Sequence, residues 1–211
     1  MKQHLLSTAY LPPVEYFAFL LTGKALIDGE ERYQKQSYRN RAVIMNGNGV
    51  LNLIIPTVHD QRMSVVKEVR IDYVTPWQRA HWRSIESAYN NTPFYLYYKD
   101  ALKPFFEQKY EYLFDFNTQL TQTLLKALQV GINVEHTETF SPYEENDTRL
   151  EIHPKKARKP DYSYRLKDPY YQVFEDKFGF SPNLSVIDLL FNEGPQAANY
   201  LHNLTKSFEI E

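Results

Sequence analysis

Cysteine is absent from this chain of 211 residues. Disulfide scaffolds, zinc sites built on thiolates and catalysis by a cysteine nucleophile are therefore excluded. Glycine is scarce, with 7 residues, and the chain has neither a G-x-G-x-x-G nor a Walker A pattern for binding phosphate. The G-x-S-x-G pattern of serine hydrolases and the H-E-x-x-H pattern of metalloproteases are also missing. The 6 histidines are scattered, and their spacing predicts no metal site.

Long apolar runs and a strong excess of one charge are lacking too. No segment approaches the roughly 20 apolar residues of a membrane helix, and the first residues lack the apolar core of a signal peptide. We therefore expect a cytoplasmic protein with no membrane span. A formal net charge of −2 and a pI of about 6.3 argue against nucleic-acid binding, which needs a basic face. The length fits a single domain, residues 1–211.

Aromatic side chains are abundant, at 15% of the chain, with 17 Tyr and 13 Phe. Because Tyr combines an apolar ring with a polar tip, this content predicts a Tyr-rich groove as well as an aromatic core. The expected ligand is a small polar molecule. The motifs assign neither a cofactor nor an oligomeric state.

The most distinct pattern is an amphipathic helix over Pro76–Phe94. Thr75 and Gln78 form a T-x-x-Q capping box at its start, and the residue before Pro93 ends it. Trp77 and His81 fall on one face of this helix, with Ile85 one turn further on.

His81 therefore has two interpretations. It is either a buried histidine that donates a hydrogen bond to a neighbouring carbonyl, or a residue of a cleft that contacts substrate or moves a proton. The ordinary histidine pKa, near 6.5, suits the second role. His81 is thus the candidate catalytic residue, and Trp77 is a candidate for stacking on the substrate.

The N-terminal half is rich in strand patterns and opens with a βαβ-like unit. A strand is predicted over His4–Tyr10, a helix over Val14–Leu21 that ends at Gly23, and a second strand over Ala25–Ile27. Open α/β sheets bind ligands at the carboxyl ends of such strands. Tyr16, in this first helix, is accordingly a candidate substrate-binding residue.

The segment Glu30–Arg41 is polar and lacks a clear period. A solvated loop is one interpretation. The other is a loop that binds a polar ligand or a phosphate, because Tyr, Lys, Asn and Arg side chains gather in it. The candidates there are Tyr33, Lys35, Asn40 and Arg41.

The remaining elements follow from hydrophobic period and turn residues. Asn46-Gly47 between Ala42–Met45 and Val50–Pro56 predicts a hairpin. Further strands are expected over Val65–Val74 and Ile132–Thr139, and helices over Leu113–Leu128 (closed by Gly131), Ser185–Phe191 and Gln196–Leu204. The middle of the chain is thus helical. A polar loop or insertion is expected over residues 141–169, and a loop of this length is either functional or solvated.

Three polar residues stand out near the C-terminus. Gln172 lies in the aromatic run YYQVF and needs a partner if it is buried. Asp188 forms an S-x-x-D capping box with Ser185, which gives it a structural explanation beside a binding one. Asn192 is either a residue of the helix end or a hydrogen-bonding group for a ligand.

Several of these segments together resemble the WbqC-like family. The family's opening Q-P-x-F-F-P-x-x-G-Y-F matches Ser7–Phe17, where Pro12, Tyr16 and Phe17 are kept but Ser7-Thr8 replaces Gln-Pro and Glu15 replaces Gly. Its Y-x-K-x-x-W-x-N-R matches Tyr33–Arg41, with Tyr38 in place of Trp. Its later motifs match Ile55-Pro56, Trp77 and His81 with Tyr89, Pro93 and Phe94 behind them, Tyr170–Phe174, and Leu184–Pro195. The resemblance runs along nearly the whole chain, which looks like a shortened branch.

From these patterns we expect an α/β fold, with α+β as the alternative, in which helices flank a mixed sheet. The resemblance implies that the chain is a transferase acting on an activated sugar or another nucleotide-linked substrate in surface polysaccharide biosynthesis. In that role Lys35 and Arg41 would pair with phosphate. The alternative is a non-catalytic binding or assembly protein with a Tyr-rich groove, in which Trp77 and His81 serve packing.

Overall fold

A parallel sheet and a separate hairpin organise the chain. The computed structural model describes residues 4–58, 64–144, 147–155, 166 and 168–209. Strand β1 (His4–Ser7), helix α1 (Val14–Leu21) and strand β2 (Ala25–Asp28) form the predicted βαβ unit. Strand β5 (Glu135–His136) pairs in parallel with β2, so the sheet order is β1-β2-β5. The α/β class is therefore confirmed.

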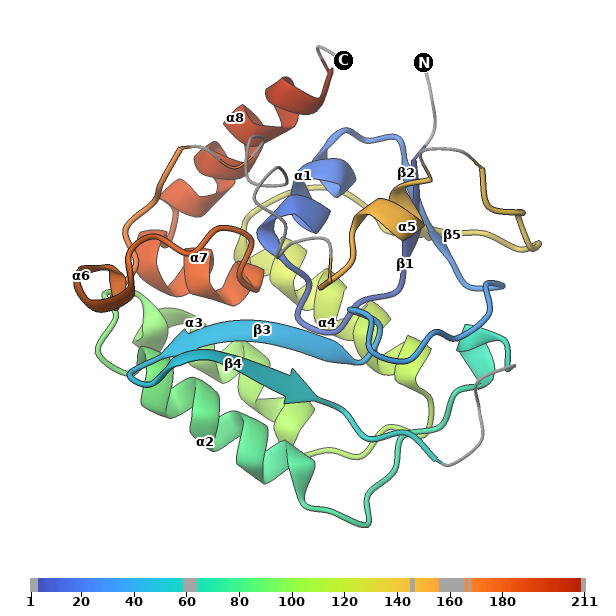
Figure 1. Cartoon of the computed structure of the whole chain (residues 1–211), viewed down its shortest axis with the longest axis horizontal. Coiled ribbons are helices and arrows are strands. Elements are labelled where there is room, and N and C mark those ends of the chain that lie inside the picture. Colours follow the sequence, from blue (N-terminus) through green and yellow to red (C-terminus); the bar gives the residue numbers. More distant parts are fainter. Residues whose placement is uncertain (1–3, 59–63, 145–146, 156–165, 167, 210–211) are drawn as a thin grey trace.

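The hairpin also forms as predicted. Strands β3 (Arg41–Asn46) and β4 (Gly49–Ile54) pair antiparallel from Arg41 with Ile54 to Asn46 with Gly49. The Asn46 side chain accepts a hydrogen bond from the backbone N–H of Asn48, which stabilises the turn. This hairpin is a sheet of its own and packs on helix α2 (Trp77–Tyr89), as Figure 1 shows.

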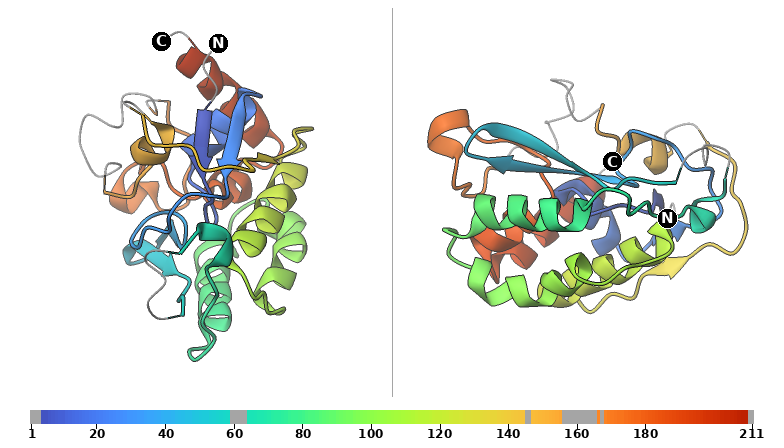
Figure 2. Two further views of the ribbon diagram at one scale, coloured as in Figure 1. Left: turned by 90° about the vertical axis from the view of Figure 1, so that its right-hand side faces the viewer. Right: turned by 90° about the horizontal axis from the view of Figure 1, so that it is seen from below.

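Helices make up most of the remaining chain. The middle holds α3 (Tyr95–Leu102), the 3₁₀ turn η2 (Lys103–Phe106) and α4 (Leu113–Ala127). The later part holds α5 (Thr148–Glu151), α6 (Glu175–Phe178), α7 (Val186–Glu193) and α8 (Gln196–Glu209). The views in Figure 2 show α2 and α4 on one side of the molecule and the parallel sheet on another. No helix within the described ranges is long and apolar enough to cross a membrane.

Helix α1 lies at the centre of the core. Every residue from Val14 to Leu21 is buried, because α1 packs against β2 as well as α7 and α8. Helix α4 buries the predicted stripe of Phe116, Leu120 and Leu124. A helix that is buried on most sides needs apolar residues all round, which explains why α1 shows almost no polar face.

Several predictions of local structure are wrong. Val65–Val74 is not a strand: it forms the 3₁₀ turn η1 (Val66–Glu68) and isolated bridges at Arg70 and Ile71. Three of its apolar residues, Val66, Val69 and Ile71, are buried, but burial of apolar residues does not require a ladder of backbone hydrogen bonds. The first strand ends at Ser7 rather than Tyr10, before Leu11 at φ 39°. The end of α4 is followed by Gln129 at φ 58°, so Gly131 does not close that helix.

The predicted capping box of α2 is also wrong. Pro76 occupies the N-cap position and no side chain caps the helix. The Gln78 amide instead donates to the carbonyls of Phe105 and Gln108, at 2.9 and 2.5 Å. Gln78 therefore ties α2 to η2, and the tertiary partner outcompetes the local one.

Gly194 provides a test of the packing at the end of α7. Its φ of 53° suits glycine, and a Cβ there would lie 2.5 Å from the ring of Phe94. Gly194→Ala should therefore lower the free energy of unfolding by about 2–3 kcal/mol or more, through backbone strain and the clash. Gly131→Ala is the matched control, because a Cβ there meets nothing within 4 Å. Equal urea midpoints for the two variants would contradict the described packing.

Candidate functional site

The carboxyl ends of the three parallel strands bring polar residues together. The register pairs Ser7, the last residue of β1, with Asp28, the last residue of β2. Ile27 pairs with His136 of β5, so Thr137 follows at the same end, and its hydroxyl donates to Asp28 Oδ1 at 2.9 Å. This is the edge at which open α/β sheets bind ligands.

The side chain of Arg149, in α5, bonds to the residues at this edge of the sheet. Its Nε donates to Asp147, and its Nη1 donates to Asp28 and to the Ser141 carbonyl. Its Nη2 donates to Asp147 and to the Pro142 carbonyl. All five N–H groups of the guanidinium therefore have partners. Arg149 holds the segment before α5 against the end of β2.

A second ion pair lies beside the first. Arg39 donates to Glu31 from Nε at 2.8 Å and from Nη2 at 2.5 Å, and both side chains are almost fully buried. The Ser7 hydroxyl donates to Glu31 Oε2 at 3.0 Å. The Asn117 amide of α4 donates to the backbone carbonyl of Arg39 at 2.8 Å. Sheet and helix thus fix this pair together.

We call these residues the ion cluster: Asp28, Glu31, Arg39, Asp147 and Arg149. Their exposed fractions are 0, 0, 1, 7 and 2%, respectively. Three carboxylates face two guanidiniums, so the cluster has a formal charge of −1. Buried charges are costly even when they are paired, and a group of them at the ligand-binding edge of a sheet marks this edge as a candidate site.

Burial and pairing shift the pKa values of the cluster in different directions. Burial raises the pKa of Glu31, although the guanidinium of Arg39 and the Ser7 hydroxyl oppose this effect. Burial also acts to raise the pKa of Asp147, but its hydrogen bonds with Arg149 hold it below its ordinary value. Glu31 is therefore the better proton acceptor of these two carboxylates.

Two cavities flank α5 at this edge. The inner cavity, of about 10 Å³, is lined by Ser7, Ala9, Tyr16, Tyr38, Arg39, Thr148, Arg149 and Ile152. It has room for about one water molecule. The outer cleft, of about 740 Å³, is lined by Leu5, Leu26, His136, Thr137, Glu138, Thr139, Ser141, Pro142, Glu144, Asp147 and Thr148. Thr148 lines both cavities. No Lys or Arg is among the described residues that line the cleft.

Tyr16 is the predicted site residue that lies in a cavity. It lines the inner cavity, and its hydroxyl donates to the Ser7 carbonyl at 2.8 Å. Tyr33, Lys35, Asn40 and Arg41 line neither cavity.

The segment that holds these four residues is largely packed rather than solvated. Tyr33 and Asn40 are buried at 3 and 8% exposure, whereas Lys35 points to solvent and Arg41 is half-buried. The backbone carbonyls of Tyr38 and Asn40 accept hydrogen bonds from Tyr10 and Ile55. The solvated-loop interpretation is therefore wrong for most of the segment.

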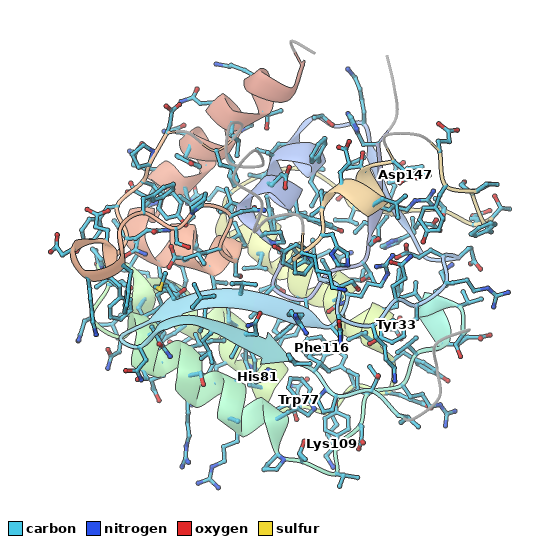
Figure 3. The ribbon with its side chains drawn as sticks, viewed as in Figure 1. Tyr33, Trp77, His81, Lys109, Phe116 and Asp147 are labelled. Carbon is cyan, nitrogen blue, oxygen red and sulfur yellow. The ribbon has the colours of Figure 1, made fainter. Side chains whose placement is uncertain are left out.

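His81 and Trp77 lie in an aromatic cluster below the hairpin, away from Asp147 and α5 (Figure 3). The Trp77 ring contacts those of His81 and Phe116, at centroid distances of 5.2 and 5.8 Å. His81 Nδ1 is 3.0 Å from the Tyr10 hydroxyl, and the imidazole also bonds to the backbone of Ile54. Burial lowers the pKa of His81 to about 4. This setting matches the buried interpretation, with a neutral ring at pH 7.

The C-terminal polar residues form a second buried network. Asp188 Oδ2 accepts from the Tyr170 hydroxyl at 2.8 Å and from the Gln172 amide at 3.1 Å. Burial raises the pKa of Asp188 to about 6. Asn192 donates to the Asp188 carbonyl at 2.8 Å. The predicted capping box is wrong here too, because no side chain caps α7 at Ser185.

Sequence patterns missed the ion cluster. Asp28 directly follows the apolar strand Ala25–Ile27, and a carboxylate at the end of a buried parallel strand is a signal that could have identified it. Arg39 lies inside the polar segment Glu30–Arg41, two positions from Arg41. Asp147 and Arg149 lie in the polar region 141–169, where periodicity gives no guide. No group of three His, Asp or Glu residues in the described ranges is arranged to hold a metal ion.

Comparisons with known proteins agree with the motifs. The chain matches the WbqC-like protein family over residues 8–164, a stretch that includes the whole ion cluster. It therefore belongs to that family. It is also 24% identical over 225 residues to the uncharacterized protein Rv1507c of Mycobacterium tuberculosis (strain ATCC 25618 / H37Rv), an alignment that covers 95% of this chain and 97% of the relative. No solved structure gives a significant match.

His81→Gln tests the buried setting of the imidazole. Because the pKa of His81 is lowered to about 4, the wild type should lose about 3 kcal/mol of stability as the pH falls from 6.5 through 4. The variant lacks this titration, so the stability difference between the two proteins should change by that amount. Urea unfolding at pH 7.5 and pH 4 measures it. If the stabilities of the wild type and the variant changed equally with pH, His81 would be exposed to solvent.

Asp188→Asn tests the second network, where the stability of the wild type should change with pH in the direction opposite to that expected for His81. Because the pKa of Asp188 is raised to about 6, its protonated carboxyl group stabilises the wild type below pH 4. This stabilisation is lost as the pH rises through 6. The variant should therefore gain about 3 kcal/mol relative to the wild type between pH 4 and pH 7.5. The same unfolding series at several pH values decides. A constant difference would mean that Asp188 stays ionised throughout.

Proposed function

We propose that this chain is a transferase that acts on an activated sugar or another nucleotide-linked substrate, bound at the carboxyl end of the parallel sheet. The observation that supports this best is the outer cleft beside the ion cluster. Its volume of about 740 Å³ lies within the range of sites for small organic ligands. It opens at the edge where α/β folds place their substrates.

The lining of the cleft favours the sugar end of such a substrate. Hydroxyl and carboxylate groups line it, including Thr137, Thr139, Ser141 and Glu138. These groups exchange hydrogen bonds with sugar hydroxyls, whereas a phosphate would meet the negative charge of Glu138 and Glu144. The phosphate end would therefore lie outside the acidic part of the cleft.

Arg39 is the best-placed group to contact an anionic part of the substrate. Its hydrogen bonds to Glu31 use Nε and Nη2, and the side chain lines the inner cavity. The Nη1 group takes no part in this ion pair and, in a cavity with room for about one water molecule, would contact the ligand through that water. Lys35 and Arg41, by contrast, line neither cavity.

A second candidate function is a binding or assembly protein that performs no chemistry. The hydrogen bonds of Arg149 favour this second function. All five N–H groups of its guanidinium are bonded within the protein, so the side chain stabilises the structure and has no donor left for a substrate. Both functions predict that a ligand binds in the cleft, but only the transferase would convert it to a product. Transfer of a labelled sugar or acyl group between two substrates would support the transferase, and saturable binding without transfer would support the second candidate.

Thr148 tests the cleft because it lines both cavities. A nucleotide sugar at about 100 times its dissociation constant should stabilise the wild type by about 2.7 kcal/mol, a rise in melting temperature of about 5–10 °C. Thr148→Val removes the hydroxyl and keeps the shape, so the dissociation constant should rise by roughly two- to tenfold. Thermal shift against nucleotide sugars, free sugars and free nucleotides measures both effects.

Thr123→Val is the matched control for this experiment. Thr123 lies on α4, and its hydroxyl donates to the Gln119 carbonyl. It should leave the ligand response unchanged. A response that is equal in wild type, Thr148→Val and Thr123→Val would place the ligand elsewhere, and no response to any of the three ligand classes would reject this substrate class.

A further inference from the structure

Ser7 and Glu31 form a close pair at the edge of the inner cavity. Ser7 is the last residue of β1 and lines the cavity, half-buried. Its hydroxyl donates to Glu31 Oε2 at 3.0 Å. A hydroxyl within hydrogen-bond reach of a carboxylate has the geometry of a nucleophile with its general base.

Both members of the pair are held in position. The Tyr16 hydroxyl donates to the Ser7 carbonyl at 2.8 Å, and the sheet register fixes Ser7 beside Asp28. Glu31 is gripped by two hydrogen bonds from Arg39. Arg39 thus serves as the third group that orients the base. Rigid support of this kind is what a reacting pair requires.

The chemistry around the pair favours an acyl group over a phosphoryl group. Glu31 is fully buried, and burial makes its carboxylate a better proton acceptor. The ion cluster has a formal charge of −1, which opposes the approach of an anionic phosphoryl group but not of a neutral carbonyl. Serine esters of acyl groups are also the ordinary covalent intermediates of serine nucleophiles.

We propose that Ser7 is a nucleophile that accepts an acyl group from an activated acyl donor, with Glu31 as its general base. This inference rests on the transferase function proposed above and names the group that is transferred. Ser7 lies directly before residues 8–164, the stretch that matches the family. The nucleophile is therefore proposed for this chain and not for the whole family.

The transfer balances in two steps. In the first, Ser7 Oγ attacks the carbonyl carbon of a thioester, and Glu31 takes the hydroxyl proton. The new Oγ–acyl bond forms as the bond to the thiolate breaks, and the leaving group departs as a thiol with the proton from Glu31. In the second, a hydroxyl or amine of the acceptor attacks the ester, Glu31 accepts its proton, and Ser7 Oγ leaves and takes that proton from Glu31.

The test is covalent labelling of the full chain with p-nitrophenyl acetate, followed by intact mass spectrometry and peptide mapping. The expected result is one acetyl group per chain, on Ser7. Ser7→Ala should abolish this label. Ser84→Ala is the matched control, because the Ser84 hydroxyl donates to a backbone carbonyl and has no carboxylate beside it. It should acetylate at the wild-type rate.

Glu31→Gln should slow the acetylation of Ser7 by about 100-fold or more, the usual contribution of a general base. A thermal melt first shows whether this variant is folded, since it leaves Arg39 without its carboxylate. If it is not folded, the pH profile of the wild type replaces it, and the acetylation rate should rise with pH and level off once Glu31 is ionised. A purely structural hydrogen bond would give no label on Ser7 and no such profile.

The outcomes separate this inference from the proposed function. An unlabelled Ser7, labelling no faster than that of Ser84, or an unchanged rate in folded Glu31→Gln would overturn the nucleophile. A retained ligand response that depends on Thr148 would in that case leave the transferase function standing, with direct attack by the acceptor. Acetylated Ser7 without any response to nucleotide sugars would reject the sugar substrate and leave the nucleophile.

Discussion

The ion pair between Arg149 and Asp28 is the interaction on which the arrangement of the site depends. It joins residues that are 121 positions apart, and both side chains are fully buried. Breaking a buried pair by removing one partner leaves an uncompensated charge and costs about 3–5 kcal/mol. The end of β2 and helix α5 are therefore held together by charge as well as by packing.

The same guanidinium organises the segment before α5. It donates two hydrogen bonds to the Ser141 and Pro142 carbonyls and two more to Asp147. A different partner could bind only if one of these hydrogen bonds broke. The Tyr143 ring stacks on it at 4.3 Å. The strand ends, the segment that covers them and the cleft beside them therefore form one coupled unit, and Thr148 has a fixed place between the two cavities.

Sequence patterns predicted the elements whose signal is local. The Val14–Leu21 helix, the Asn-Gly hairpin and the α4 helix are specified by apolar period and turn residues over a few positions. The two capping boxes were wrong because a distant partner outcompeted a local one: Gln78 bonds to η2 and not to its own helix, and Asp188 bonds to Tyr170 and Gln172. Asp28 could have been identified from its place at the end of a strand, but the other members of the ion cluster lie in segments without period. Their pairing depends on a topology that the pattern does not specify.

The two buried networks differ in whether a hydrogen-bond partner of the central carboxylate lines a cavity. Asp188 lies among neutral donors that satisfy it, and neither cavity reaches it, so its effect is on stability. Glu31 lines neither cavity, but one of its oxygens accepts a hydrogen bond from the hydroxyl of Ser7, which lines the inner cavity. A carboxylate whose partner is accessible can exchange a proton with a ligand, whereas one enclosed by side chains can only titrate with the fold. This difference, and not the size of either pKa shift, makes the end of the parallel sheet the better candidate site of the two.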